Sequence, residues 1–154
     1  MRWLKLWWPA LIWVVLISSF STGAFSSDHT SVIIIPLLRW LLPNASPETL
    51  SELHYLIRKC AHFVEYFILS LLVLRGIRAG RKETHIGWAL VAIGVVAGYA
   101  ALDEFHQSFV PGREAAVADV LLDTAGGVAA QLVAALFIFW GDVRARQKEK
   151  ASGA

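Results

Sequence analysis

The chain has 154 residues, of which 56% are hydrophobic and 17% charged, and it carries seven tryptophans. This length is typical of one domain, and the composition is too apolar for an ordinary soluble domain. The formal net charge of +2 gives no reason to expect nucleic acid as a partner. A single cysteine, Cys60, excludes an intrachain disulfide and a cysteine-rich metal site. The sequence therefore predicts an integral membrane protein.

The first predicted element is an apolar span over about residues 3–20, preceded by the basic Arg2. It is just long enough to cross a bilayer. A signal peptide with a small-residue cleavage site near Ala24 is the alternative. Three tryptophans lie near the start of the chain, and they favour an interfacial anchor over a cleaved leader. We therefore expect this span to be retained.

The next region is mixed. Residues 32–42 form an apolar run that is interrupted by a proline and an arginine. The run is too short to cross a bilayer, so we expect it to lie in or dip into the interface. Ser46 followed by Pro47 is typical of a helix start. Apolar residues then recur at helical spacing, which predicts one long helix to Leu74 with a membrane span over about residues 59–75.

Two more spans are predicted after a basic turn. The third covers about residues 85–103 and contains Gly94 and Gly98, a GxxxG pair that favours close helix packing. The fourth covers about residues 117–140, and we expect the polar tail 141–154 to be frayed. Small residues on the fourth span offer a second packing face. They are Gly126, Gly127, Ala130 and Ala134.

The positive charges predict the orientation of the spans. With the N-terminus in the cytoplasm, ten of the 14 Lys and Arg residues lie on the cytoplasmic side and four on the other. The positive-inside rule favours this arrangement. We therefore expect both termini in the cytoplasm. The four outer cations are Arg39, Arg58, Lys59 and Arg113.

This topology brings polar residues of three spans to the outer face. They are Arg58, Lys59, His62, Glu65 and Tyr66 on the second span, Asp103, Glu104, His106 and Gln107 on the third, and Arg113, Glu114, Asp119 and Asp123 beside the fourth. Helical spacing predicts one shared face for Asp103, His106 and Gln107, and another for Asp119 and Asp123. We name these residues the polar cluster.

The size of the polar cluster indicates a function beyond helix packing. Charged groups near hydrocarbon are costly, so we expect Arg58, Lys59 and Arg113 to be counter-ions of its carboxylates. Two histidines, six carboxylates and three cations exceed what helix packing needs. A buried polar network costs stability unless it is fully satisfied. We therefore expect a ligand-binding or catalytic role, and the alternative is a purely structural network.

Two stretches, RKCAHFVEY at residues 58–66 and DEFHQSFVPGR at residues 103–113, resemble motifs of the VanZ-like family of bacterial membrane proteins. Asp119 and Asp123, followed by glycines, continue the likeness. The family pattern has Asn more often than Asp at the position of Asp123, so this chain carries an added negative charge there. The resemblance covers about residues 11–137.

The resemblance implies about four spans and a location in the bacterial cytoplasmic membrane. It also implies a link to glycopeptide resistance, because the founding member confers low-level resistance to teicoplanin. It implies no known reaction, and a family name alone does not establish a molecular function.

We expect the site to face outside and to bind an anionic lipid or a lipid-linked cell-envelope headgroup. The expected partners are thus membrane lipids and anionic or lipid-linked cell-wall intermediates. Arg58, Lys59 and Arg113 would supply charge-assisted bonds to phosphate or carboxylate. The other predicted ligand-binding residues are Tyr66, Glu104, Gln107, Asp119 and Asp123.

An enzyme that acts on such a headgroup is the second hypothesis. His62 or His106 would be the base, paired with Glu65 or Asp103 to fix the tautomer. Ser108 lies near but lacks a nucleophile-elbow motif.

A metal site is the third hypothesis. His62 with Glu65, and Asp103 with His106, are i, i+3 pairs that resemble the carboxylate–histidine pattern of helix bundles. Cations beside these ligands oppose a bound metal, so we expect no metal and no other cofactor. Ion-coupled transport is a weaker option, because the spans are few and no broken helix is evident.

Overall fold

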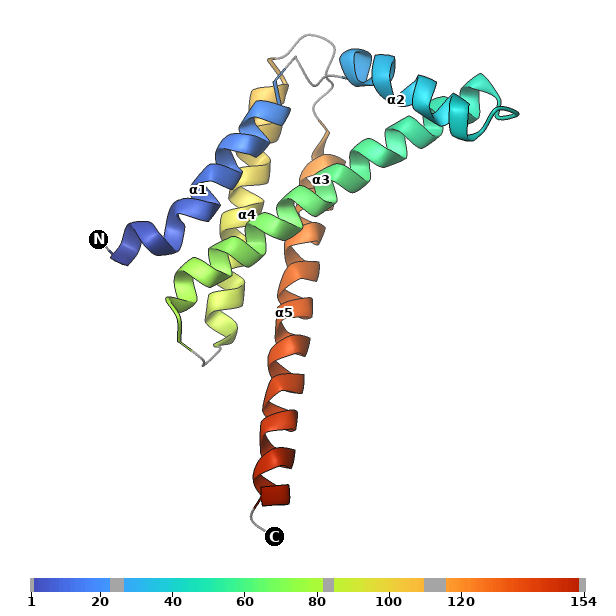
Figure 1. Ribbon diagram of the computed structural model, residues 1–154. Helices are drawn as coiled ribbons and strands as arrows, with labels where there is room; N and C mark the ends of the chain where they lie inside the picture. The colour runs from blue at the N-terminus through green and yellow to red at the C-terminus, as the bar shows by residue number, and fades with distance from the viewer. Residues whose placement is uncertain (1, 23–26, 82–84, 110–115, 153–154) are drawn as a thin grey trace.

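The computed structural model describes residues 2–22, 27–81, 85–109 and 116–152. Over these residues the protein is all-helical, and Figure 1 shows its elements. They are α1 (Arg2–Phe20), α2 (Ser27–Leu41), α3 (Pro47–Arg78), α4 (Ile86–Gln107) and α5 (Val117–Ser152). All of them except α2 are long and apolar enough to cross a membrane, by length and composition. The prediction of an all-α protein with about four spans is confirmed.

The start of α3 follows the predicted signal. The Ser46 hydroxyl accepts a hydrogen bond from the backbone N–H of Thr49 at 3.2 Å, and Pro47 is the first helical residue. The helix continues past the predicted end at Leu74 and closes on Ala79, which has φ 51° and ψ 33°. This left-handed residue ends the helix in the usual way for a C-terminal cap.

Helix α2 is a short helix of 15 residues that contains Pro36. It is too short to cross a bilayer. It packs against the first half of α3, and the two together project away from the other helices (Figure 1). The predicted interfacial run is therefore part of a helix that begins earlier, at Ser27.

Helix α5 has 36 residues and extends beyond the other helices at its C-terminal end (Figure 1). The prediction of a frayed tail after Trp140 is wrong for residues 141–152, because these residues are helical. The reason is local: Arg, Gln, Lys, Glu and Ala dominate the tail, and all have high helix propensity.

Helix α3 is the centre of the packing, because it contacts each of the other four helices. It packs closely on α5, where a Cβ added at Gly126 would lie 2.4 Å from the carbonyl oxygen of Phe63. A Cβ at Gly127 would lie 2.8 Å from Cγ1 of Val96 on α4. The predicted small-residue face of α5 is therefore used for close packing.

The GxxxG pair of α4 behaves differently. A Cβ added at Gly94 or Gly98 would meet nothing within 4 Å, so their predicted packing is wrong among the described residues. Helix α4 instead turns Ala92, Val96 and Ala100 to the core. These positions lie on the other side of the helix from the glycines, which follows from the 3.6-residue repeat.

The core is small, and α1 joins it through α3. Arg75 on α3 donates from Nη1 to the carbonyl oxygen of Leu6 at 2.8 Å. Trp13 donates from its indole nitrogen to the carbonyl oxygen of Glu65 at 2.8 Å. The buried cluster contains Ile17, Tyr66, Leu69, Val73, Leu74, Ala92, Val96 and Ala100.

Candidate functional site

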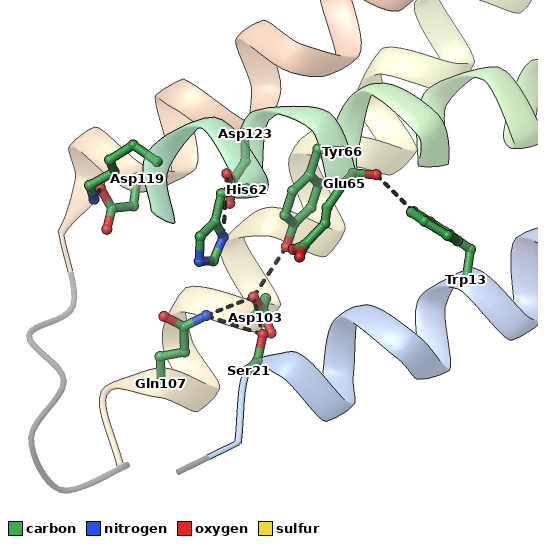
Figure 2. A network of polar contacts seen from close by, with 10 residues as sticks. Trp13, Ser21, His62, Glu65, Tyr66, Asp103, Gln107, Asp119 and Asp123 are labelled. Atoms are coloured by element: carbon green, nitrogen blue, oxygen red, sulfur yellow. Dashed lines mark hydrogen bonds and ion pairs between the residues drawn. The ribbon is translucent and has the colours of Figure 1, made fainter. Parts of the chain in front are cut away.

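Most of the polar cluster gathers at one end of the bundle, which we name the polar end. It is built by the end of α1, the middle of α3, the end of α4 and the first turns of α5 (Figure 2). The polar end contains several contacts between helices and one pocket.

The first contact is a cage around Asp103. Its Oδ2 atom accepts hydrogen bonds from Ser21 Oγ at 2.8 Å, Tyr66 OH at 3.3 Å and Gln107 Nε2 at 2.8 Å (Figure 2). All these donors are uncharged, and all four residues are buried. A carboxylate that accepts several hydrogen bonds is stabilised without a cation. The Asp103 cage (Ser21, Tyr66, Asp103 and Gln107) therefore ties α1, α3 and α4 together.

Glu104 also meets a neutral donor. Its Oε1 atom accepts a hydrogen bond from the backbone N–H of Ala116 at 2.6 Å, immediately before α5. A carboxylate at a helix N-terminus interacts favourably with the helix dipole. Glu104 thus positions the start of α5 against the end of α4.

The second contact is an ion pair between α3 and α5. Lys59 Nζ bonds Asp119 Oδ1, and the side chains are 24% and 27% exposed. The Lys59 ammonium also lies 5.1 Å from the ring centroid of Tyr55. Lys59 therefore neutralises one carboxylate, as the sequence predicted for a cation at this position.

The third contact joins His62 and Asp123. The Nδ1 atom of His62 lies 3.8 Å from Oδ1 of Asp123 (Figure 2). The Asp123 side chain is only 4% exposed, whereas that of His62 is 23% exposed. Among the described residues, Asp123 Oδ1 has no hydrogen-bond partner. The structure thus places a buried carboxylate behind a more accessible imidazole.

A pocket of about 230 Å³ opens beside His62, and we name it the Arg58 pocket. Arg58, His62 and Glu65 form its polar wall, because these positions share one face of α3. Its other lining residues are Phe20 from α1, Thr30 and Ile34 from α2, and Ile57 and Ala61 from α3.

Thr30 connects α2 to this wall. Its hydroxyl accepts a hydrogen bond from Arg58 Nη1 at 3.0 Å and lies 3.1 Å from His54 Nε2. His54 is buried. These contacts hold α2 over the pocket and orient the guanidinium within it.

Some predicted residues lie elsewhere. His106 is exposed beside Phe105, so the predicted face that it shares with Asp103 and Gln107 is wrong. The buried positions 103, 104 and 107 define the inward face of α4, and position 106 lies at its edge. Arg113 and Glu114 lie outside the described residues. In the part of the chain that the structure describes, no three His, Cys, Asp or Glu side chains group to hold a metal.

Sequence reasoning missed Ser21, Thr30 and His54. Ser21 could have been predicted, because it is the first residue after the predicted first span. The end of that span lies on the same side of the membrane as the polar cluster. His54 could also have been predicted, since it precedes Arg58 by one helical turn. Thr30 could not, because its role depends on how α2 folds back on α3.

The comparisons with known proteins give one result. A protein-family model described as VanZ/LLP1 matches residues 6–139, which is nearly the whole chain. No curated protein and no solved structure matches the chain.

Proposed function

The chain belongs to the VanZ-like family of membrane proteins, and from this premise we propose that its Arg58 pocket binds an anionic lipid or a lipid-linked cell-envelope headgroup. The observation that carries this proposal is the pairing of a guanidinium with apolar walls in one pocket. A guanidinium suits phosphate because its planar donors match two oxygens at once.

The position of Arg58 in the pocket supports it as the anion-binding residue. Asp103 and Glu104 accept hydrogen bonds from neutral donors, and Asp119 is bonded to Lys59. These three carboxylates are thus engaged outside the pocket. Arg58 lies on the pocket wall itself, and its Nη1 atom donates to the hydroxyl of Thr30 at 3.0 Å.

The apolar residues support a lipid over a free anion. Phe20, Ile34 and Ile57 line the pocket and suit the first carbons of a hydrocarbon chain. Val32 and Trp40 on α2 are more than 70% exposed, which suits a helix that lies in the membrane interface. An amphipathic ligand would therefore meet both a charged and an apolar surface.

The orientation is part of the proposal. The charge bias favours a polar end that faces outside. We expect a single cysteine introduced by Ser108→Cys, in a Cys60→Ser background, to react with a membrane-impermeant thiol reagent in intact cells. Protection at position 108 together with labelling at a cysteine placed at Gly80 would place the polar end in the cytoplasm instead.

The test of binding compares arginines on the same proposed side of the membrane. Native mass spectrometry of Arg58→Gln should show at least a tenfold loss of retained anionic lipid, because a charge-assisted bond is worth about 1.5–3 kcal/mol. Arg58→Lys should fold normally and lose most of the retention, since lysine keeps the charge without the planar fork. Arg39→Gln removes an exposed arginine of α2 and is the matched control. Equal retention by Arg58→Gln and wild type would contradict the proposal.

Two finer elements accompany this proposal. Arg113 is proposed as a second cation of the site, and Arg113→Lys should then insert normally and lose anionic lipid.

We also propose that the protein contributes to teicoplanin resistance through the bound headgroup. Expression in a susceptible bacterium should raise the inhibitory concentration of teicoplanin, and Arg58→Lys should abolish that rise.

A further inference from the structure

His62 stands between the Arg58 pocket and a buried carboxylate. It lies one helical turn after Arg58 on α3 and lines the same pocket. Its Nδ1 atom faces Asp123 at 3.8 Å, and its other ring nitrogen points away from that carboxylate (Figure 2). The imidazole therefore lies between the buried carboxylate of Asp123 on α5 and the pocket proposed for the headgroup.

This arrangement has a defined chemical consequence. A carboxylate at Nδ1 favours the tautomer that carries its proton there, which leaves a lone pair on Nε2. The same carboxylate stabilises the imidazolium that forms when Nε2 takes a proton. A separation of 3.8 Å is longer than a hydrogen bond, and such contacts commonly tighten when substrate binds.

We propose that the bound headgroup is a substrate, and that His62 is the general base for hydrolysis of a lipid phosphate monoester held by Arg58. Asp123 is a positioning residue, because it acts through the imidazole. This inference rests on the proposed function, since the Arg58 pocket must first bind the phosphate.

The step balances as a simple hydrolysis. Nε2 of His62 takes a proton from a water molecule whose oxygen attacks phosphorus, and the bond between phosphorus and the lipid alcohol oxygen breaks. The alcohol oxygen then receives the proton from Nε2. Neutral His62 is restored, and inorganic phosphate and the lipid alcohol leave. Arg58 would offset the charge on the phosphoryl oxygens during this step.

Asp103 and Asp119 do not compete for this role. Asp103 is enclosed by Ser21, Tyr66 and Gln107, and Asp119 is bonded to Lys59. His106 lies on the exposed side of α4 and is not among the residues that line the pocket. Of the two histidines predicted as bases, the geometry thus favours His62.

The experiment uses the purified full-length protein in phosphatidylcholine vesicles that contain phosphatidic acid or a long-chain polyprenyl phosphate. Lipid retention and release of inorganic phosphate are measured on the same samples. Wild type should bind and release phosphate from at least one probe. His62→Gln should bind as wild type and lose about 100-fold or more of the release rate, which is typical for loss of a general base. Arg39→Gln should match wild type in both measurements.

Asp123→Asn separates positioning from packing. It should lower kcat with little change in KM, because the amide no longer supports the imidazolium, and both variants should elute as wild type in gel filtration. Binding without phosphate release by wild type, or full release by His62→Gln, would overturn the hydrolysis and leave the binding proposal standing. If His62→Gln fails to fold, His62→Asn replaces it. Wild type that retains neither probe would overturn the proposed function itself.

Discussion

The Asp103 cage and the Arg58 pocket lie within about a turn of each other along α3, yet their polar groups differ in how they are surrounded. In the cage, one buried carboxylate accepts three hydrogen bonds from neutral side chains. In the pocket, Arg58 and His62 line a space of about 230 Å³ beside apolar side chains. The cage is closed by the protein's own donors, whereas the pocket has room for a ligand.

The difference shows how one polar cluster divides into structural and functional parts. A buried polar group is tolerated when its hydrogen bonds are made, which is the condition that the cage meets. Asp123 is even more buried than Asp103, and His62, which can carry a positive charge, lies 3.8 Å from its carboxylate. A buried carboxylate with fewer hydrogen bonds costs stability, and this cost indicates a functional role for Asp123.

The largest effect is expected from Asp103→Ala. It leaves the three donors of the cage without their acceptor, at roughly 1–3 kcal/mol for each buried group. The free energy of unfolding should therefore fall by about 3 kcal/mol or more, measured by denaturant titration in detergent. Asp103→Asn keeps an acceptor oxygen and should lose less. Wild-type stability in Asp103→Ala would show that the cage does not hold α1, α3 and α4 together.

A smaller loss is expected from Gly126→Val. The added carbons meet the backbone carbonyl of Phe63, and overpacking of this kind typically costs about 1–3 kcal/mol. The ion pair of Lys59 with Asp119 and the contact of His62 with Asp123 should also be disturbed, because both join α3 to α5. Gly94→Val is the matched control, since a Cβ there meets nothing within 4 Å. Equal thermal stability of the two variants would contradict the described packing.

Asp123→Leu separates the two regions, because its expected effect on the free energy of unfolding has the opposite sign to that of Asp103→Ala. A buried oxygen without a hydrogen-bond partner costs stability, so replacing Asp123 by an apolar side chain of similar size should be neutral or stabilising by about 1 kcal/mol. Asp103→Leu should be strongly destabilising in the same assay. A large loss of stability in Asp123→Leu would indicate that Asp123 is structural, like Asp103.

The smallest effect is expected from Lys59→Met. Its ion pair with Asp119 is partly exposed, and such pairs contribute about 0.2–1 kcal/mol. The loss should shrink at high salt, because salt screens exposed charges. An effect as large as that of Asp103→Ala would place Lys59 among the structural residues.

The spans, the Ser46 cap and the small-residue face of α5 could be predicted because they depend on local sequence. Span length follows from hydropathy, and a capping hydroxyl before proline acts within one helical turn. The tail of α5 is helical although its polarity predicts fraying. Its residues favour a helix even without an apolar face.

The division of the polar cluster could not be predicted, because it depends on which side of each helix meets a neighbour. On a helix of 3.6 residues per turn, His106 lies about 60° from Asp103 around the axis, on the side away from Glu104 and Gln107, which takes it out of the buried face. The pocket also needs Thr30 and Phe20 from α2 and α1. Their contribution depends on how those helices fold against α3.

Photo-crosslinking with a lipid probe tests the central claim most directly. The protein is placed in vesicles that contain a photoactivatable phosphatidic acid with its reactive group next to the phosphate, and the labelled peptides are mapped by mass spectrometry. We expect label on the segments that line the Arg58 pocket, at about residues 30–34 and 57–65. This label should fall at least tenfold in Arg58→Gln and persist in Arg39→Gln. Label that is spread over the exposed apolar faces and unchanged by Arg58→Gln would contradict headgroup binding in the pocket.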